Sequence, residues 1–302
     1  MSEEPAPPEE PKPEESEPEE RQTTPFLVLQ FFVFPMAIVA ACVAVFVVFG
    51  LISSDAKTPR DHLADVRRGG GMFGVKRWQA AFAFASALDS EKEQKKRDPE
   101  LVKETLALFE ESKNDDPRVR RYLALALGRM RDPAAVPALL GIVRDPQSDP
   151  DGETVVHAVL ALGYIGDPAA VPDLVALAAQ PDAGLRKVAL HALRTFDRED
   201  ARAALRRALS DPVADVRWNA ALGLARWRDP AATPVIAQML DREQLAGVPD
   251  LSPDQANDVV LEAVNGAALL GDASLQPALA RLRDGDPDLK VREAARIALA
   301  PR

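Results

Sequence analysis

The chain has 302 residues, with 47 acidic against 37 basic side chains, a formal charge of −10 at pH 7 and one cysteine. This acidity argues against a general nucleic-acid-binding protein, which needs a basic surface. A single cysteine excludes a disulfide framework and a zinc site built from cysteines. The 26 prolines and the aromatic content of 5% favour short, regularly interrupted helices of small residues over one large core.

Residues 1–25 contain nine glutamates and seven prolines, and no aliphatic side chain after Met1 is larger than alanine. Such a segment cannot bury enough apolar surface to offset the entropy lost on ordering. We therefore expect a disordered, acidic, proline-rich tail. Two roles are open for it: a disordered tail with no binding role, or a solvated acidic segment that attracts a basic partner.

Residues 26–52, from Phe26 to Ile52, run for 27 residues without a charged side chain. As a helix this run would be roughly 40 Å long, more than the ~30 Å hydrocarbon core of a bilayer. The sequence therefore predicts a transmembrane helix, since a buried core helix would need apolar partners on every side. A cleaved signal peptide fits poorly, because the preceding region is acidic. Cys42 resembles a lipobox cysteine, but ten apolar residues follow it, so we expect it to pack within the span.

Residues 53–74 form the predicted juxtamembrane linker, which contains a hinge of three glycines from Gly69 to Gly71. Glycine runs are flexible because no side chain restricts their backbone. Arg67 and Arg68, directly before the hinge, are placed to touch anionic lipid head groups. Positive charge is concentrated on this side of the span, and positive flanks stay in the cytoplasm. We therefore expect the rest of the chain inside the cell and the tail outside, with the reverse topology as an open alternative.

Residues 75–302 are organised by a repeated string, GRMRDPAAVPALL, which begins at Gly128 and returns as GYIGDPAAVPDLV from Gly163. In these copies Asp132 and Asp167 are predicted helix caps, and the proline after each has the φ favoured at the first helical position. Each string is expected to end one helix and begin the next. The spacing is typical of a solenoid. Further copies align at Arg198, Asp229 and Asp272, and the last step carries an insertion near residues 241–256.

Two segments, DPRVRRYLALALGRMRDPAAVPALLGIVRD (116–145) and DPVADVRWNAALGLARWRDPAATPVIAQML (211–240), resemble HEAT repeats of the short type known from phycobilisome lyases. The likeness covers about three quarters of the chain. It implies an all-α fold, an α-solenoid of stacked helix pairs over residues 75–302, preceded by the transmembrane helix and the disordered tail. HEAT repeats occur in scaffolds, lyases, hydroxylases and peptide-binding proteins, so the likeness leaves the function open.

The position twelve residues before each predicted cap is most often arginine, and we call this position the arginine column. Residues three and seven positions after it are small or apolar and share one helix face, which predicts burial. Trp227, ten positions after it, is also expected in the core. The arginines are expected to bond carboxylates and carbonyls in the adjoining turns. The column holds Arg120, Arg186, Arg217 and Arg292, with Val155 and Val260 in two repeats.

Positions two, five and nine after the arginine column change character between repeats and fall on one side of a helix. In the proteins that this chain resembles, such a face is concave and binds partners. Aromatic and arginine side chains are the usual anchors of an interface. For each predicted residue the alternative is a solvated side chain or packing between repeats. The predicted contacts are Trp78, Tyr122, Arg129, His157, Tyr164, His191, Trp218, Asn219 and Arg226.

The sequence contains no recognised catalytic or metal-binding motif. The chain has three histidines, and none belongs to an HExxH motif or to the His-Glu pairs that bind iron in HEAT-like hydroxylases. We predict no cofactor and no metal. We expect a non-catalytic, membrane-tethered scaffold that binds a protein partner, and neither nucleic acid nor a small molecule. The alternatives are a lyase- or oxidoreductase-type enzyme subunit and a structural subunit of a membrane complex.

Overall fold

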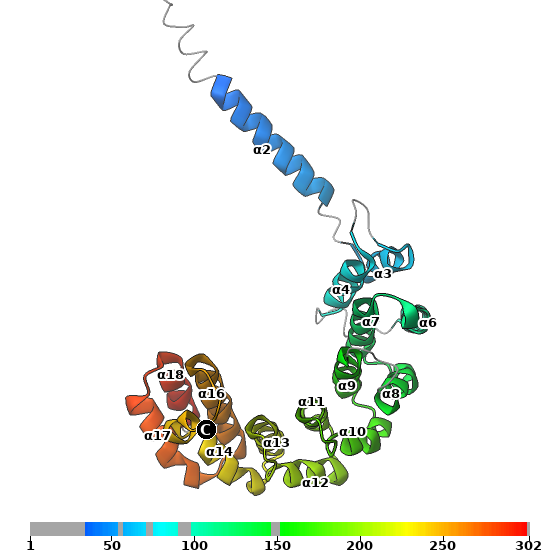
Figure 1. Ribbon diagram of the computed structural model, residues 1–302. Helices are drawn as coiled ribbons and strands as arrows, with labels where there is room; N and C mark the ends of the chain where they lie inside the picture. The colour runs from blue at the N-terminus through cyan, green and yellow to red at the C-terminus, as the bar shows by residue number, and fades with distance from the viewer. Residues whose placement is uncertain (1–33, 54–56, 71–74, 90–97, 146–151, 301–302) are drawn as a thin grey trace, which may run out of the picture. The chain divides into compact units, whose positions relative to one another are not determined.

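The computed structural model describes residues 34–53, 57–70, 75–89, 98–145 and 152–300. Every regular element in these ranges is a helix (Figure 1). The chain divides into two units, Met1–Ala56 and Lys57–Arg302. The α-helices are α2 (Phe34–Ser53), α3 (Pro59–Arg67), α4 (Arg77–Ala87), α6 (Pro99–Glu111), α7 (Pro117–Met130), α8 (Val136–Arg144), α9 (Glu153–Ile165), α10 (Val171–Leu177), α11 (Ala183–Leu193), α12 (Glu199–Ala208), α13 (Ala214–Arg226), α14 (Thr233–Met239), α15 (Arg242–Ala246), α16 (Pro253–Leu270), α17 (Gln276–Gly285) and α18 (Leu289–Ala298).

The first unit contains α2, a helix of 20 residues with no acidic side chain in its first turn and no basic one in its last. Among the residues described, no helix meets the combined length and apolarity required to cross a membrane. The predicted transmembrane assignment is therefore not supported here. The acidic tail and residues 26–33, where the predicted span begins, lie outside the described residues.

The second unit is an α-solenoid of helix pairs in two layers. We call the layer of α4, α7, α9, α11, α13, α16 and α18 the first row. The second row holds α3, α6, α8, α10, α12, α14 and α17, and Figure 1 shows the pairs following one another in chain order. Neighbours in the first row pack directly on one another and on helices of the second row. The all-α, solenoid-like fold predicted from the sequence is confirmed.

The corners between paired helices are built by the repeated Asp-Pro string. Asp132, Asp167 and Asp229 each accept a hydrogen bond from the backbone N–H two residues later, at 2.9, 2.8 and 3.0 Å. One 3₁₀ turn follows, Pro133–Ala135 in the first copy, before the α-helix begins. Proline suits this position because its missing N–H has no acceptor within the helix. Arg198 differs, since its side chain makes no capping bond to α12.

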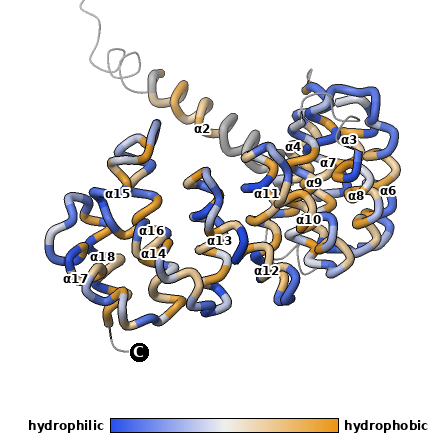
Figure 2. The backbone as a smooth tube through the Cα atoms, turned by 60° about the horizontal axis from the view of Figure 1, so that its bottom comes forward, coloured by the Kyte–Doolittle hydropathy of each residue, from blue (hydrophilic) through white to orange (hydrophobic). Residues whose placement is uncertain are grey.

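The buried core follows the predicted columns. Each helix of the second unit has hydrophobic and hydrophilic segments, as expected where one face is buried (Figure 2). Residues seven positions after the arginine column are buried except Leu299, which is partly buried at the end of the stack. Trp227 is half-buried beneath the guanidinium of Arg202. We call the residues three positions after the arginine column, together with Ala80, which stands three positions after Arg77 in α4, the third column. They are at most 3% exposed: Ala80, Leu123, Ala158, Ala189, Ala220, Ala263 and Ala295.

The arginine column ties the helices to the adjoining turns. Arg186 forms a bidentate pair with Asp211, at 2.8 and 2.9 Å. Arg217 donates to the backbone carbonyl of the same aspartate at 2.7 Å, and Arg292 donates to a carbonyl in the turn before α18 at 2.6 Å. The guanidinium of the buried Arg120 lies 5.1 Å from the ring centroid of Phe109. Charge-assisted bonds of this kind are stronger than neutral ones, so Arg186, Arg217 and Arg292 stabilise the corners that they reach.

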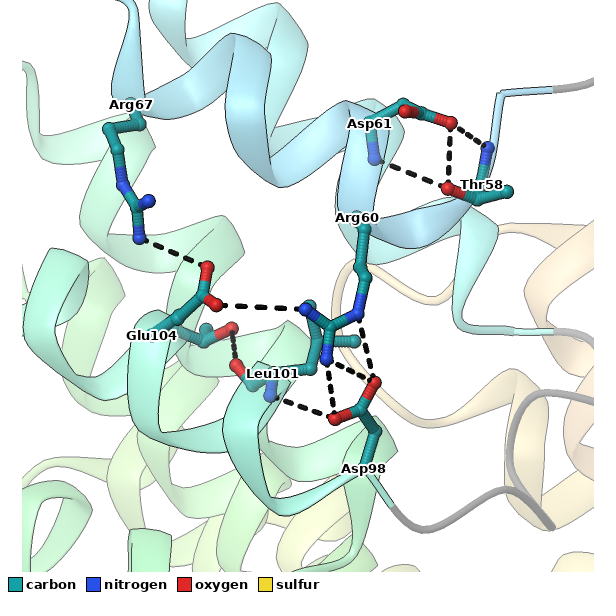
Figure 3. A network of polar contacts seen from close by, with 8 residues as sticks. Thr58, Arg60, Asp61, Arg67, Asp98, Leu101 and Glu104 are labelled. Carbon is teal, nitrogen blue, oxygen red and sulfur yellow. Dashed lines mark hydrogen bonds and ion pairs between the residues drawn. The ribbon is translucent and has the colours of Figure 1, made fainter.

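Helix α3 lies within the solenoid unit, although the sequence placed its residues in the juxtamembrane linker. Val66 is fully buried in the core. Figure 3 shows two arginines of α3 reaching the start of α6, where Arg60 donates to Asp98 and Arg67 donates to Glu104 at 3.0 Å. Arg67, which we expected to contact lipid head groups, is therefore hydrogen-bonded to Glu104 of α6.

Two of the three hinge glycines have backbone angles that other residues rarely adopt. Gly69 and Gly70 have φ of 89° and 142°. A Cβ at Gly70 would collide with the carbonyl oxygen of Val75. Glycine is therefore required here by conformation and close approach, beyond the flexibility expected of the run. Gly71 lies outside the described residues.

Small residues set the distance between neighbouring helices of the first row. A Cβ added to Gly128 on α7 would lie 2.5 Å from the Cα of Ala161 on α9. A Cβ added to Gly163 on α9 would lie 3.1 Å from the Cα of Ala192 on α11. These neighbouring atoms are backbone and cannot rotate away. The first row is therefore in backbone contact at both crossings.

We predict that Gly128→Ala lowers the free energy of unfolding by about 1–3 kcal/mol, because the added methyl group pushes α7 away from α9. Gly163→Ala should lower it by less, because the contact there is longer. Gly141→Ala on α8 is the control: nothing lies within 4 Å of that Cβ, and helix propensity alone should raise stability by about 0.5–1 kcal/mol. Urea unfolding measures all three. Equal stabilities for the variants at 128 and 141 would contradict the tight crossing.

Candidate functional site

A groove of about 610 Å³ is lined mainly by α9, α11, α13 and α16 of the first row, with Met239 of α14 also contributing. This volume is in the range of ligand-binding clefts, roughly 300–1,000 Å³. Apolar side chains make up most of its lining, and polar groups stand among them. The main apolar residues are Val156, Leu160, Trp218, Leu222, Leu251 and Val259.

One wall of the groove comes from the unusual length of α16. This helix has 18 residues, whereas α9 and α13 have 13 and α11 has 11. Its additional residues lie at the N-terminal end and supply Gln255 to the groove, ahead of Asp258 and Val259. Ser252 starts them with a capping box, in which its hydroxyl accepts from the backbone N–H of Gln255 at 3.2 Å. The insertion before α16 therefore builds the wall.

Three predicted contact residues meet in the groove: His191, Trp218 and Asn219. His191 is half-buried and shares a side-chain hydrogen bond with Asn219. The Asn219 amide also donates to the backbone carbonyl of Asp215 at 2.9 Å. Trp218 is only 7% exposed, so it is a packed part of the wall and not the accessible anchor expected from the sequence. Its truncation to alanine should therefore lower stability as well as binding.

Two further predicted residues form an aromatic row on α4, α7 and α9. The ring of Tyr122 lies edge-on to Phe82, with centroids 5.2 Å apart, and to His157, with centroids 6.4 Å apart. The Nδ1 atom of His157 lies 2.8 Å from the carbonyl oxygen of Glu153, which holds the ring in place. Phe82 is 51% exposed, although it was not among the predicted contacts. These rings extend the apolar surface of the first row toward the beginning of the chain.

The remaining predicted residues do not line the groove. Arg129 donates to a backbone carbonyl of α4 at 2.6 Å and lies 3.4 Å from the carboxylate of Asp89, so it ties α7 to α4. Trp78 lies beneath the guanidinium of Arg118, 4.5 Å from the ring centroid. Tyr164 and Arg226 are exposed at the ends of α9 and α13. Arg129 thus has partners within the solenoid, away from the groove.

The prediction missed the leucines and the carboxylates of the groove. Leu160 and Leu222 occupy the fifth position after the arginine column. At this position the prediction selected the polar His191 and left the leucines out. Asp258 lies two positions before Val260, as Asp215 lies two before Arg217, and this position was not among those used to predict contacts. The longer step before Asp272 was a separate signal, since it marked the insertion that precedes α16.

The charges of the groove are mainly negative. Its lining contains the carboxylates of Asp215, Asp258 and Glu262 against the ammonium of Lys187. Burial lowers the pKa of the imidazole of His191 below its usual value, the positive charge of a nearby arginine acts in the same direction, and the bond with Asn219 opposes them. At neutral pH His191 is therefore uncharged. Within the described ranges, no three metal-ligating side chains are grouped to hold a metal ion.

Consecutive helix pairs joined by repeated Asp-Pro corners define an α-solenoid repeat protein. The family model for HEAT repeats matches residues 72–151, 105–194, 146–213 and 176–248. These overlapping matches cover more than half of the 302 residues, so the chain belongs to the HEAT-repeat family.

Two solved structures resemble the chain distantly. YibA of Escherichia coli is 19% identical, with a TM-score of 0.47 over 80% of this chain and 81% of that one. Human deoxyhypusine hydroxylase, solved in complex with glycerol, is 20% identical, with a TM-score of 0.33 over 80% of this chain and 88% of that one. These scores are too low to carry an argument about function. No curated protein matches the chain significantly.

We predict that the solenoid loses stability as the pH falls below about 6.5, the usual pKa of an unfolded histidine. Because the pKa of His191 is lowered in the folded state, the unfolded state binds more protons in this window, and stability falls with pH. The pKa of His62 is also lowered by burial, so part of the slope survives in His191→Gln. Urea unfolding at about pH 7.5 and pH 5.5 measures the difference. An unchanged slope in His191→Gln would contradict this origin.

Proposed function

We propose that this HEAT-repeat protein is a non-catalytic scaffold that binds a protein partner across the first row of its solenoid, with the groove as the main contact. The observation that carries the proposal is the groove itself. It has an apolar floor, crosses several repeats and brings together His191, Trp218 and Asn219. An apolar surface rimmed by polar groups is typical of an interaction site.

The adjacent surface supports a partner larger than a small ligand. A stable protein interface buries about 800 Å² on each side, more than one groove supplies. The aromatic row of Phe82, Tyr122 and His157 adds apolar area on the preceding helices of the same row. Aromatic side chains are also enriched among the residues that dominate binding energy. A partner seated in the groove would extend along this row.

Membrane attachment through residues 26–52, with the repeats in the cytoplasm, is the second part of the proposal. It rests on the uncharged run of sequence and on the positive charge that follows it. Confinement to one surface would raise the effective concentration of a membrane-associated partner. We also propose that the repeats are of the phycobilisome-lyase type, on the strength of the two strings that resemble it.

We predict that Leu160→Asn combined with Leu222→Asn weakens partner binding at least about tenfold, since both side chains line the groove and central apolar contacts dominate binding energy. Leu289→Asn, at a residue that is 72% exposed outside the groove, is the control and should bind as the parent does. Affinity capture from native extract with mass spectrometry identifies the partner, and titration measures the change. Equal binding by the groove variant and the control would overturn the proposal, provided both unfold at similar temperatures.

For the membrane attachment, we predict that the full chain stays with the membrane fraction after an alkaline carbonate wash, because only an inserted segment resists that treatment. Deletion of residues 26–52 should release the protein to the soluble fraction. Protease added to intact spheroplasts should spare the repeats if they are cytoplasmic. Release of the full chain by carbonate would refute the anchor, and digestion of the repeats would reverse the topology.

A further inference from the structure

Two carboxylates of α16 line the groove without forming an ion pair there. Asp258 and Glu262 are exposed, line the groove and stand one helical turn apart. Neither forms an ion pair with any residue that the structure describes. Like charges at this spacing disfavour a helix by about 0.2–0.5 kcal/mol. A helix dipole stabilises negative charge in the first turn of a helix. Asp258 and Glu262 lie beyond the first turn of α16, so they do not gain this stabilisation.

Two cationic side chains near this pair do not form ion pairs with it. Lys187, the only lysine in the lining, lies 3.1 Å from the carboxylate of Asp215. Arg194 lies within electrostatic reach of Glu262 but forms no ion pair with it, and burial lowers the pKa of its guanidinium. The wall formed by α16 is therefore negative beside an apolar floor. Such an arrangement is complementary to a ligand that carries positive charge next to apolar side chains.

We propose that the groove accepts a cationic, apolar segment of the protein partner. One or two large apolar side chains would pack on Leu160, Trp218 and Leu222, and a lysine or arginine would lie against Asp258 and Glu262. This inference rests on the proposed function, to which it adds the chemistry of the partner. Helix-in-groove recognition by other proteins uses the same division between apolar anchors and flanking charges.

Charge also argues against the acidic tail of this chain as the occupant. Residues 1–25 contain nine glutamates against one lysine and one arginine. Their negative charge would meet the carboxylates of α16 and weaken binding, because like charges across an interface are repulsive. The groove is therefore expected to take a segment from another protein.

The test uses three short fluorescein-labelled peptides of equal length: one of leucine and arginine, one of leucine and glutamate, and one of serine and arginine. The full chain is held in a neutral detergent, and empty micelles provide the background. Fluorescence anisotropy measures the dissociation constant of each peptide. The leucine–arginine peptide should bind at least about tenfold more tightly than either of the others, because it alone offers both apolar and cationic contacts.

Asp258→Asn combined with Glu262→Gln should weaken the leucine–arginine peptide about three- to tenfold, since solvent-exposed ion pairs contribute little each. Added salt should weaken the parent complex more than the variant complex. Glu111→Gln combined with Glu243→Gln is the matched control. It removes the same charge from two exposed residues outside the groove and should leave the dissociation constant unchanged.

The outcomes separate the inference from the function on which it rests. If Leu160→Asn with Leu222→Asn abolishes peptide or partner binding while the carboxylate variant binds like its control, the charge inference is overturned and the groove remains the binding site. Tighter binding of the leucine–glutamate peptide would also overturn it. Equal binding of the serine–arginine peptide would overturn the apolar half. Binding of the partner that is indifferent to every groove variant would overturn the proposed function itself.

Discussion

Backbone contact between neighbouring helices of the first row is the constraint from which the surface of this solenoid follows. At Gly128 the α7 and α9 backbones approach too closely for a Cβ, and alanines fill most of the third column along the stack. Helices packed on such small residues have little freedom to rotate, because close-packed interiors transmit displacement. The register fixed by this contact decides which positions of every repeat are covered and which face outward.

The groove arises where that regularity is broken. The helices α9, α11 and α13 repeat the same geometry, whereas the insertion before α16 adds turns that extend beyond them. Leu222 and Trp218 belong to the regular stack, as do Asp258 and Val259 by their positions before Val260, whereas Gln255 belongs to the added turn. A regular solenoid would present a more even face at this place. The departure from the repeat therefore creates the hollow, while the repeat supplies its floor.

Local periodicity was enough to predict the core and the corners, because both are decided within a single repeat. Asp132 caps its helix as expected, and the columns three and seven positions after the arginines are buried. The candidate site was less predictable. A helical face predicted from one repeat does not reveal that Trp218 is buried, or that Arg129 reaches back to α4. Asp258 was missed because its position, two residues before Val260, was not among those used to predict contacts, although Asp215 occupies the same position in the preceding repeat.

The apolar floor and the negative wall of the groove contribute differently to binding. Burial of apolar area is non-directional, so a floor of leucine, valine and tryptophan provides affinity for many side chains and little discrimination. Charge supplies the discrimination, since a ligand of the wrong sign meets Asp258 and Glu262 unpaired. His191 contributes no positive charge at neutral pH, because burial disfavours its protonated form. The apolar floor and the negative wall together restrict the partner more than either does alone.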